Sequence, residues 1–257
     1  MKIIAIIPAH LKSVRLPRKI ILKIHGLEMI EHVRRRALLC KFFDEVYVAT
    51  DNNEIAEIVK KNNGNIIKTK KIHSSGTSRV IEACEGIEAS HIVLIQGDEP
   101  LMLPDHLNKI CESIAKNPHI DTWNATAELS NPEELERRSI VKCILNNEGK
   151  IIFCFRGNFS SSTFENQKLY TKKILGLIAF RKDIIMQFKD YLPSTFEISE
   201  SIEQLRFIEN NINLQSVQVN PSLPSINEYE DKKIVLDFIE NNLNQKSLLK
   251  QILNQNK

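Results

Sequence analysis

The chain has 257 residues, of which 42% are hydrophobic and 26% are charged. This composition is typical of an ordinary globular protein, and it excludes the disordered and fibrous classes. The net charge of +3 is too small for a nucleic-acid-binding surface, and the aromatic residues are too few and too scattered to stack single-stranded bases. We therefore expect no nucleic-acid partner.

The cysteines and the apolar runs indicate the cellular compartment of the protein. The five cysteines are widely spaced, form no C-x-x-C pair and are odd in number, which predicts reduced, mostly buried thiols. The N-terminal apolar run, residues 3–7, is too short for a signal-peptide core, and no later run reaches the roughly 18 apolar residues of a membrane span. We expect a cytoplasmic protein without a membrane segment.

Strands and helices alternate in the first hundred residues. Continuous apolar runs such as residues 3–7 are typical of strands that are buried on both faces of a parallel sheet. In chain order the sequence predicts strand 3–7, helix 28–39, strand 45–50, helix 54–61 with its cap at 51–53, strand 65–68 and strand 91–95. This order favours an α/β fold with a doubly wound, mostly parallel sheet, whose ligand binds beyond the C-terminal ends of the strands.

The remainder of the chain predicts a small accessory lobe and a C-terminal tail. The predicted elements are helix 104–116, a hairpin of strands 140–145 and 151–155, an exposed loop 157–168, strand 175–180, helices 182–189 and 199–209, strand 217–219 and helix 228–242. Residues 244–257 predict a short amphipathic helix that docks on the body or on a partner. We therefore expect one domain over residues 1–243, followed by a tail over residues 244–257.

The segment after the first strand is rich in basic residues. It has neither the Gly-x-Gly-x-x-Gly of a dinucleotide site nor the Gly-Lys-Ser/Thr of a P-loop. It does place five basic side chains within ten residues at a strand end, namely His10, Lys12, Arg15, Arg18 and Lys19. Such a cluster can hold a polyphosphate, although basic loops are more often solvated surface.

A second group of polar residues ends the buried strand 91–95. Asp98 and Glu99 follow it directly within residues 96–100 (QGDEP). Carboxylates at such a place are costly unless a cation or a metal pairs with them, although they can also cap the next helix. The position favours a metal site and leaves the capping role open.

Three motifs together resemble the cytidylyltransferases that make CMP-Kdo, where Kdo is 3-deoxy-manno-octulosonate. Residues 7–19 (IPAHLKSVRLPRK) resemble that family's phosphate loop, residues 73–79 (HSSGTSR) its nucleotide-binding turn, and residues 96–100 its metal-binding turn. Residues 193–206 (PSTFEISESIEQLR) continue the similarity, which covers roughly residues 1–240. Three motifs in this order are far more specific than any one of them.

The resemblance implies a Rossmann-like nucleotidyltransferase fold and the transfer of CMP from CTP to an acidic 3-deoxy sugar, with release of pyrophosphate. Arg15 and Lys19 would hold the β- and γ-phosphates, and Asp98 would hold Mg²⁺; these three are the implied catalytic residues. The implied nucleotide-binding residues are Pro8, Ala9, His10, Arg15, Lys19, Ser75, Gly76, Thr77, Arg79, Gln96 and Asp98. We expect a homodimer that serves lipopolysaccharide biosynthesis.

The acceptor side is implied by the same resemblance. The implied sugar-binding residues are Lys142, Arg156, Glu197 and Gln204. Arg156 suits the sugar carboxylate, while Glu197 and Gln204 suit its hydroxyls. Glu197 and Gln204 are about equally well explained as exposed residues without a role in binding.

Three positions depart from the family pattern. His10 stands where the family has Arg, Ile174 stands where it has His, and Asn227 stands where it has its second metal carboxylate. An Asn carbonyl can bind a hard metal but adds no negative charge. Two alternatives therefore stay open: a synthetase for a CMP-nonulosonate of the sialic acid type, and a catalytically impaired nucleotide-binding homologue.

Overall fold

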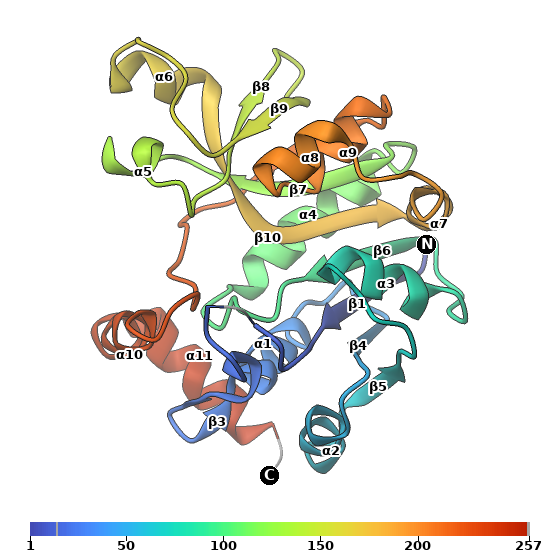
Figure 1. Ribbon diagram of the computed structural model, residues 1–257. Helices are drawn as coiled ribbons and strands as arrows, with labels where there is room; N and C mark the ends of the chain where they lie inside the picture. The colour runs from blue at the N-terminus through green and yellow to red at the C-terminus, as the bar shows by residue number, and fades with distance from the viewer. Residues whose placement is uncertain (14, 256–257) are drawn as a thin grey trace. The chain divides into compact units, whose positions relative to one another are not determined.

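The computed structural model describes residues 1–13 and 15–255, and the chain divides into two compact units (Figure 1). Unit 1 contains Met1–Asn108 and Leu223–Lys257, and unit 2 contains Lys109–Ser222. Residues 256 and 257, at the end of the predicted tail, lie outside the described residues.

Unit 1 is built on a parallel sheet. Its strands, in the order in which they pair, are β6 (His91–Ile95), β1 (Ile3–Pro8), β4 (Glu45–Thr50) and β5 (Asn65–Lys68). Every residue of β1 and β6 is buried, as continuous apolar runs predict for strands with helices on both faces. The predicted α/β class is confirmed, and so are all four predicted strands of this unit.

Helices cover this sheet. The α-helices are α1 (Met29–Ala37), α2 (Asn53–Lys61), α3 (Gly76–Cys84), α10 (Asp231–Asn241) and α11 (Leu243–Asn254), while α4 (Pro104–Lys116) starts here and continues into unit 2. A 3-10 turn, η1 (Lys19–Ile21), precedes the short hairpin of β2 (Lys23–Ile24) and β3 (Leu27–Glu28). Helix α2 begins where the sequence predicts it, because the Asn52 side chain accepts a hydrogen bond from the Ile55 amide. Helix α3 is not predicted by the sequence patterns above.

The tail forms the expected helix. In α11, Leu248 and Ile252 are buried, whereas Leu253 is exposed, so the apolar side of the helix is narrower than the sequence indicates. The helix packs against α1 and α10 within unit 1. The predicted boundary between a domain and a tail at residue 243 stays a prediction.

Unit 2 contains a mixed sheet. Its strands are β7 (Thr122–Ala127), β8 (Lys142–Leu145), β9 (Ile151–Phe155), β10 (Thr171–Arg181) and β11 (Leu214–Gln218). Strand β10 runs antiparallel to β7 and β8, while β11 runs parallel to β7. The predicted hairpin is confirmed as the antiparallel pair of β8 and β9. The helices are α5 (Glu133–Glu136), α6 (Phe164–Tyr170), α7 (Lys182–Phe188), α8 (Thr195–Glu200) and α9 (Gln204–Glu209).

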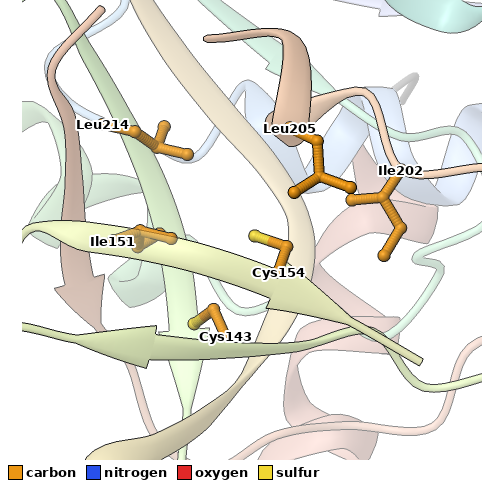
Figure 2. Packing of buried hydrophobic residues seen from close by; sticks show 6 residues of the cluster. All are labelled: Cys143, Ile151, Cys154, Ile202, Leu205 and Leu214. Atoms are coloured by element: carbon orange, nitrogen blue, oxygen red, sulfur yellow. The ribbon is translucent and has the colours of Figure 1, made fainter. Parts of the chain in front are cut away.

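Part of the core of unit 2 lies between this hairpin, α9 and β11. Figure 2 shows Cys143 and Cys154 on the two strands of the hairpin, close to Leu205 and Leu214. The packing holds the first residues of α9 against the hairpin. All five cysteines are buried thiols that form no disulfide, as predicted.

Two of the predicted elements in unit 2 are wrong. Residues 157–168 are not a loop throughout, because Thr163 caps a helix that starts at Phe164. Residues 199–209 are not one helix: Ser194 and Glu197 form a capping box that starts α8 early, and Ser201 ends it in the left-handed conformation at φ 54°. Strand β10 also extends well beyond the predicted residues 175–180.

Among residues 1–13 and 15–255, none of the helices has the length and apolar character that a membrane span requires.

Candidate active site

The nucleotide motifs converge at the C-terminal ends of the unit 1 strands. Pro8 ends β1, and the Ala9 amide donates a hydrogen bond to the Ala49 carbonyl in β4 at 2.9 Å. A Cβ atom at Gly76 would lie 3.1 Å from Cγ of Pro8 and 3.3 Å from both side-chain amide atoms of Gln96. A side chain at position 76 would therefore crowd Pro8 and Gln96, and glycine allows the three motifs to approach closely.

Helix α3 presents its N-terminus at this junction. Its cap is Ser75, whose hydroxyl accepts from the Ser78 amide at 3.2 Å while the Ser78 hydroxyl accepts from the Ser75 amide. Gly76 and Thr77 form the first turn, and Thr77 is fully buried. The N-terminal end of a helix carries a partial positive charge, which favours anions. The predicted residues 75–77 are thus placed where a phosphate or ribose oxygen can be bound.

Two basic side chains, Lys19 and Arg15, bind side-chain oxygens at the QGDEP turn and at the neighbouring residue Asn227. Lys19 Nζ donates to Asp98 Oδ2 at 2.6 Å and to the Ile226 carbonyl at 3.1 Å. Arg15 Nη2 donates to Asn227 Oδ1 at 2.8 Å. The Ile226 amide in turn donates to the Asp98 carbonyl at 3.1 Å. The structure therefore brings together Arg15, Lys19, Asp98 and Asn227, while Arg18 of the basic cluster pairs with Glu54 instead.

Gly97 allows the close contact between η1 and the QGDEP turn. A Cβ atom at Gly97 would collide with Cδ1 of Ile20, the residue next to Lys19. Without a side chain at position 97, η1 approaches the QGDEP turn closely enough for the ammonium of Lys19 to contact Asp98. The Lys19 and Asp98 side chains are 14% and 27% exposed, so a ligand can reach both groups.

Arg79 holds a different position from the other basic residues. It is buried in α3, and its Nη1 lies 2.9 Å from Asp51 Oδ1 and 2.5 Å from Thr69 Oγ1. Asp51 and Thr69 directly follow β4 and β5, so the guanidinium joins the ends of two strands. Its predicted contact with the nucleotide stays a prediction.

His10 lies close to these charges. Burial lowers the pKa of His10 from its ordinary value of 6.5, and the nearby Arg79 and Lys19 lower it further. The imidazole is therefore neutral at pH 7 in the ligand-free protein. The negative charge of a bound polyphosphate would offset the effect of Arg79 and Lys19 on this pKa and favour the protonated imidazole.

One residue that the sequence interpretation did not single out, Glu82, organises the approach to α3. Its carboxylate accepts from the Lys70 amide at 2.7 Å and the Lys71 amide at 3.2 Å, and it lies 2.7 Å from His73 Nε2. Although burial acts to raise it, these hydrogen bonds lower the pKa of the Glu82 carboxyl. His73 thus holds the nucleotide-binding turn in place through an acid on the helix itself.

The predicted sugar-binding residues lie in unit 2. Lys142 is fully buried, and its ammonium donates to the carbonyls of Arg137, at 3.1 Å, and Arg156. Burial lowers the pKa of Lys142 to about 8. Arg156 donates from Nε to the Glu200 carbonyl at 2.7 Å and from Nη2 to the Ser201 carbonyl at 3.0 Å. Both cations are thus bonded to backbone oxygens.

Glu197 and Gln204 are also bonded within unit 2. The Glu197 carboxylate accepts from Nε and Nη2 of Arg206, which forms a two-point ion pair. Gln204 Nε2 donates to Asn124 Oδ1 at 3.0 Å. The structure links Arg156 to the junction of α8 and α9, and Gln204 begins α9, so these two lie near one another in the fold.

The described residues contain no group of three or more His, Cys, Asp or Glu side chains arranged to hold a metal ion. Magnesium commonly takes only one or two protein ligands and completes its coordination with water and substrate phosphates. Asp98 and Asn227 supply one carboxylate and one amide oxygen of the hard type that Mg²⁺ binds.

Comparisons with known proteins agree with this geometry. A family model described as cytidylyltransferase matches residues 4–217. The 3-deoxy-manno-octulosonate cytidylyltransferase of Geobacter sulfurreducens is 31% identical over 228 residues, which cover 85% of this chain and 91% of that protein. The enzyme of the same name from Koribacter versatilis is 34% identical over 217 residues, which cover 83% and 81% of the two chains.

Solved structures give the same result. The structure of a CMP:2-keto-3-deoxy-manno-octonic acid synthetase complexed with CTP superposes with a TM-score of 0.87 at 30% identity, and the match covers 93% of this chain and 99% of that one. A 4-diphosphocytidyl-2C-methyl-D-erythritol synthase from Anaerococcus prevotii, at 16% identity and a TM-score of 0.64, shares the fold. The chain is therefore a nucleotidyltransferase that belongs to the 3-deoxy-manno-octulosonate cytidylyltransferase family.

Proposed function

We propose that this protein transfers CMP from CTP to Kdo or a closely related 3-deoxy sugar acid. The anomeric hydroxyl oxygen of the sugar forms a bond to the α-phosphorus of CTP. The bond from that phosphorus to the bridging oxygen breaks, pyrophosphate leaves, and the hydroxyl proton passes to solvent. The observation that carries the proposal is the pairing of Lys19 with Asp98 and of Arg15 with Asn227 at the strand ends.

These pairs can be exchanged for ligand contacts. Lys19 and Arg15 bind oxygen atoms of side chains in the ligand-free protein, and phosphate oxygens offer them the same kind of acceptor with more negative charge. Transfer of the two cations to the β- and γ-phosphates leaves the oxygens of Asp98 and Asn227 available. No covalent intermediate is needed, because positioning and electrostatic stabilisation account for catalysis of this type.

The released oxygens fit Mg²⁺. Asp98 supplies a carboxylate and Asn227 an amide oxygen, and the hydrogen bond between the Ile226 amide and the Asp98 carbonyl holds their backbones together. When bound, Mg²⁺ supplies positive charge that polarises the α-phosphate. One oxygen of the nearby Asp231 carboxylate, Oδ2, accepts from the amides of Asn227 and Glu228.

The acceptor would be bound by residues of unit 2. We propose that Arg156 contacts the sugar carboxylate and that Gln204 contacts a hydroxyl. Carbonyl oxygens accept hydrogen bonds from all three nitrogens of the Arg156 guanidinium, which orients the group rigidly. Contacts of Lys142 and Glu197 with the sugar stay predictions; their observed hydrogen bonds hold the surrounding backbone and Arg206.

The test is pyrophosphate release from CTP with Mg²⁺ and a panel of acceptors. Kdo is expected to give release, and replacement of CTP by UTP or ATP is expected to abolish most of it. Release with a nonulosonate but not with Kdo would move the assignment to a CMP-nonulosonate synthetase. If no acidic sugar supports release while CTP still binds, the protein is an impaired homologue and the proposal is wrong.

Asn227→Asp tests the metal assignment. A second carboxylate adds negative charge to a hard-cation site, so the Mg²⁺ concentration that gives half-maximal rate should fall about threefold or more. Glu228→Gln is the control, because it changes the charge of the next residue without changing position 227. No shift in the Mg²⁺ response of Asn227→Asp would remove this residue from the metal site.

We also propose a homodimer that resides in the cytoplasm. Phe159 and Phe196 are 59% and 55% exposed, and they contact Phe155 and Phe153 edge to face, which leaves an aromatic row of unit 2 open to a partner. Five cysteines that form no disulfide suit a reducing compartment. Sedimentation equilibrium should give twice the chain mass, and Phe159→Ser/Phe196→Ser should give the monomer, whereas the control Leu192→Ser should not.

A further inference from the structure

The carbonyl of Leu101 is held by two buried side chains from distant parts of unit 1. Gln245 in α11 donates from Nε2 to this oxygen at 2.8 Å. Arg36 in α1 donates from Nη1 to the same oxygen at 3.5 Å and to the Met102 carbonyl at 3.3 Å. Gln245 is 1% exposed and Arg36 is fully buried. The residue they hold is three positions after Asp98.

Of the two donors, Gln245 makes the better bond. A distance of 2.8 Å is a good N–H···O bond, whereas 3.3–3.5 Å is long. Nε and Nη2 of Arg36 have no hydrogen-bond partner among the described residues, so this buried cation has little else to stabilise its place. Among the side chains of the described residues, removal of the Gln245 donor would leave the Leu101 carbonyl with the long bond from Arg36.

Helix α11 is firmly attached at its other end. Arg35 Nη1 donates to the Ile252 carbonyl in the last turn of α11 at 2.7 Å, and Gln255 Nε2 donates to the Arg35 carbonyl at 3.2 Å. The fully buried Glu31 orients Arg35 through a bond from Nε at 3.1 Å. Because α11 is anchored on α1 in this way, the position of Gln245 is defined by the core rather than by the QGDEP turn.

The turn is also held at Asp98 itself. The Ile226 amide binds the Asp98 carbonyl, and Lys19 joins the Asp98 carboxylate to the Ile226 carbonyl. When Lys19 transfers to phosphate, this side loses a bond. The Leu101 end then carries more of the positioning, which makes the Gln245 bond most important when nucleotide is bound.

We propose that Gln245 is a positioning residue, through which α11 sets the QGDEP turn and thereby the Asp98 carboxylate for nucleotide and metal. This role rests on the proposed cytidylyltransferase activity. Helices α10 and α11 lie outside residues 4–217, which the family model matches, so the assignment adds to the motifs that the family model contains.

The test compares Gln245→Met with Val59→Ala. Methionine keeps the length of the side chain but removes the donor. Val59 is fully buried in α2, so its truncation lowers thermal stability and provides the stability control. Both proteins are assayed for pyrophosphate release and, separately, for CTP binding by calorimetry in the presence of Mg²⁺.

Gln245→Met should lower kcat and weaken CTP binding about fivefold each, raise the Mg²⁺ requirement, and leave the KM for the sugar unchanged. Val59→Ala should leave all four within twofold. Equal effects in both variants, or wild-type CTP parameters in Gln245→Met, would overturn the positioning role while the wild type remains active. If the wild type itself neither binds nor uses CTP, the proposed function fails, and this role fails with it.

Discussion

The basic side chains of the candidate nucleotide site in unit 1 and of the candidate acceptor site in unit 2 differ in their hydrogen-bond acceptors. In unit 1, Lys19 and Asp98 meet side chain to side chain from separate segments, and so do Arg15 and Asn227. In unit 2, Lys142 and Arg156 are bonded to backbone carbonyls. A side-chain pair can exchange partners when a ligand arrives, whereas a buried carbonyl that loses its donor is left unsatisfied. The first arrangement suits a site that changes on binding, and the second suits a rigid frame.

The two lysines illustrate the difference. Lys19 faces a carboxylate and remains reachable by solvent, whereas Lys142 is fully buried and the pKa of its ammonium falls to about 8 because of burial. The same side-chain chemistry therefore has different consequences in the two units. We expect substitutions in the Lys19–Asp98 and Arg15–Asn227 pairs to affect activity first, and substitutions of the candidate acceptor-site residues of unit 2 to affect stability first.

The largest expected effect is on turnover in unit 1. Asp98→Asn should lower kcat at least about 100-fold, because it removes negative charge that holds the metal where charge develops. Urea unfolding should change little, since the carboxylate is partly exposed. The control is Asp105→Asn, an exposed carboxylate at the start of α4. Near-normal turnover in Asp98→Asn would contradict the assigned role.

In unit 2 the corresponding change should act on stability. Glu197→Gln breaks the two-point ion pair with Arg206 and should reduce the free energy of unfolding by about 2 kcal/mol, as loss of one partner from a largely buried pair does. Urea unfolding measures this, with Glu200→Gln as the control. A raised KM for the sugar without a loss of stability would instead place Glu197 in the acceptor site.

Arg15→Ala should have a smaller effect in unit 1. It removes one cation from the polyphosphate and should raise the KM for CTP about tenfold, with kcat changed less. Arg18→Ala is the matched control, because Arg18 is exposed and pairs with Glu54. If both variants have the wild-type KM for CTP, the phosphate-loop assignment is contradicted.

The smallest expected effect concerns pH. The pKa of free His10 lies below 6.5, and a bound polyphosphate raises it. The contribution of His10 to CTP affinity is therefore complete below the free-state pKa and is lost as pH rises through the bound-state pKa. From about pH 6 to about pH 8 the KM for CTP should rise about threefold, and His10→Arg should flatten this rise. Identical pH profiles would show that His10 does not contact phosphate.

Much of unit 1 could be predicted from local sequence. Buried strands appear as continuous apolar runs. Asn52 marks the start of α2 because its side chain caps an amide three residues later, at Ile55. Both signals therefore act within a few residues. Unit 2 is less predictable. The end of α8 depends on the left-handed conformation of Ser201, a residue that has no strong local preference for it.

The site divides in the same way. The sequence alone identified which residues follow the strand ends, because the strands appear as apolar runs. It also predicted that these residues lie together, since the C-terminal ends of parallel strands meet at one edge of the sheet. Only the tertiary structure decided the partners: Arg15 meets Asn227 across 212 positions of the chain, and Arg156 meets two carbonyls near Ser201. The partners in such pairs are far apart in the chain, and no local sequence pattern links them. They meet because of the packing of the whole fold.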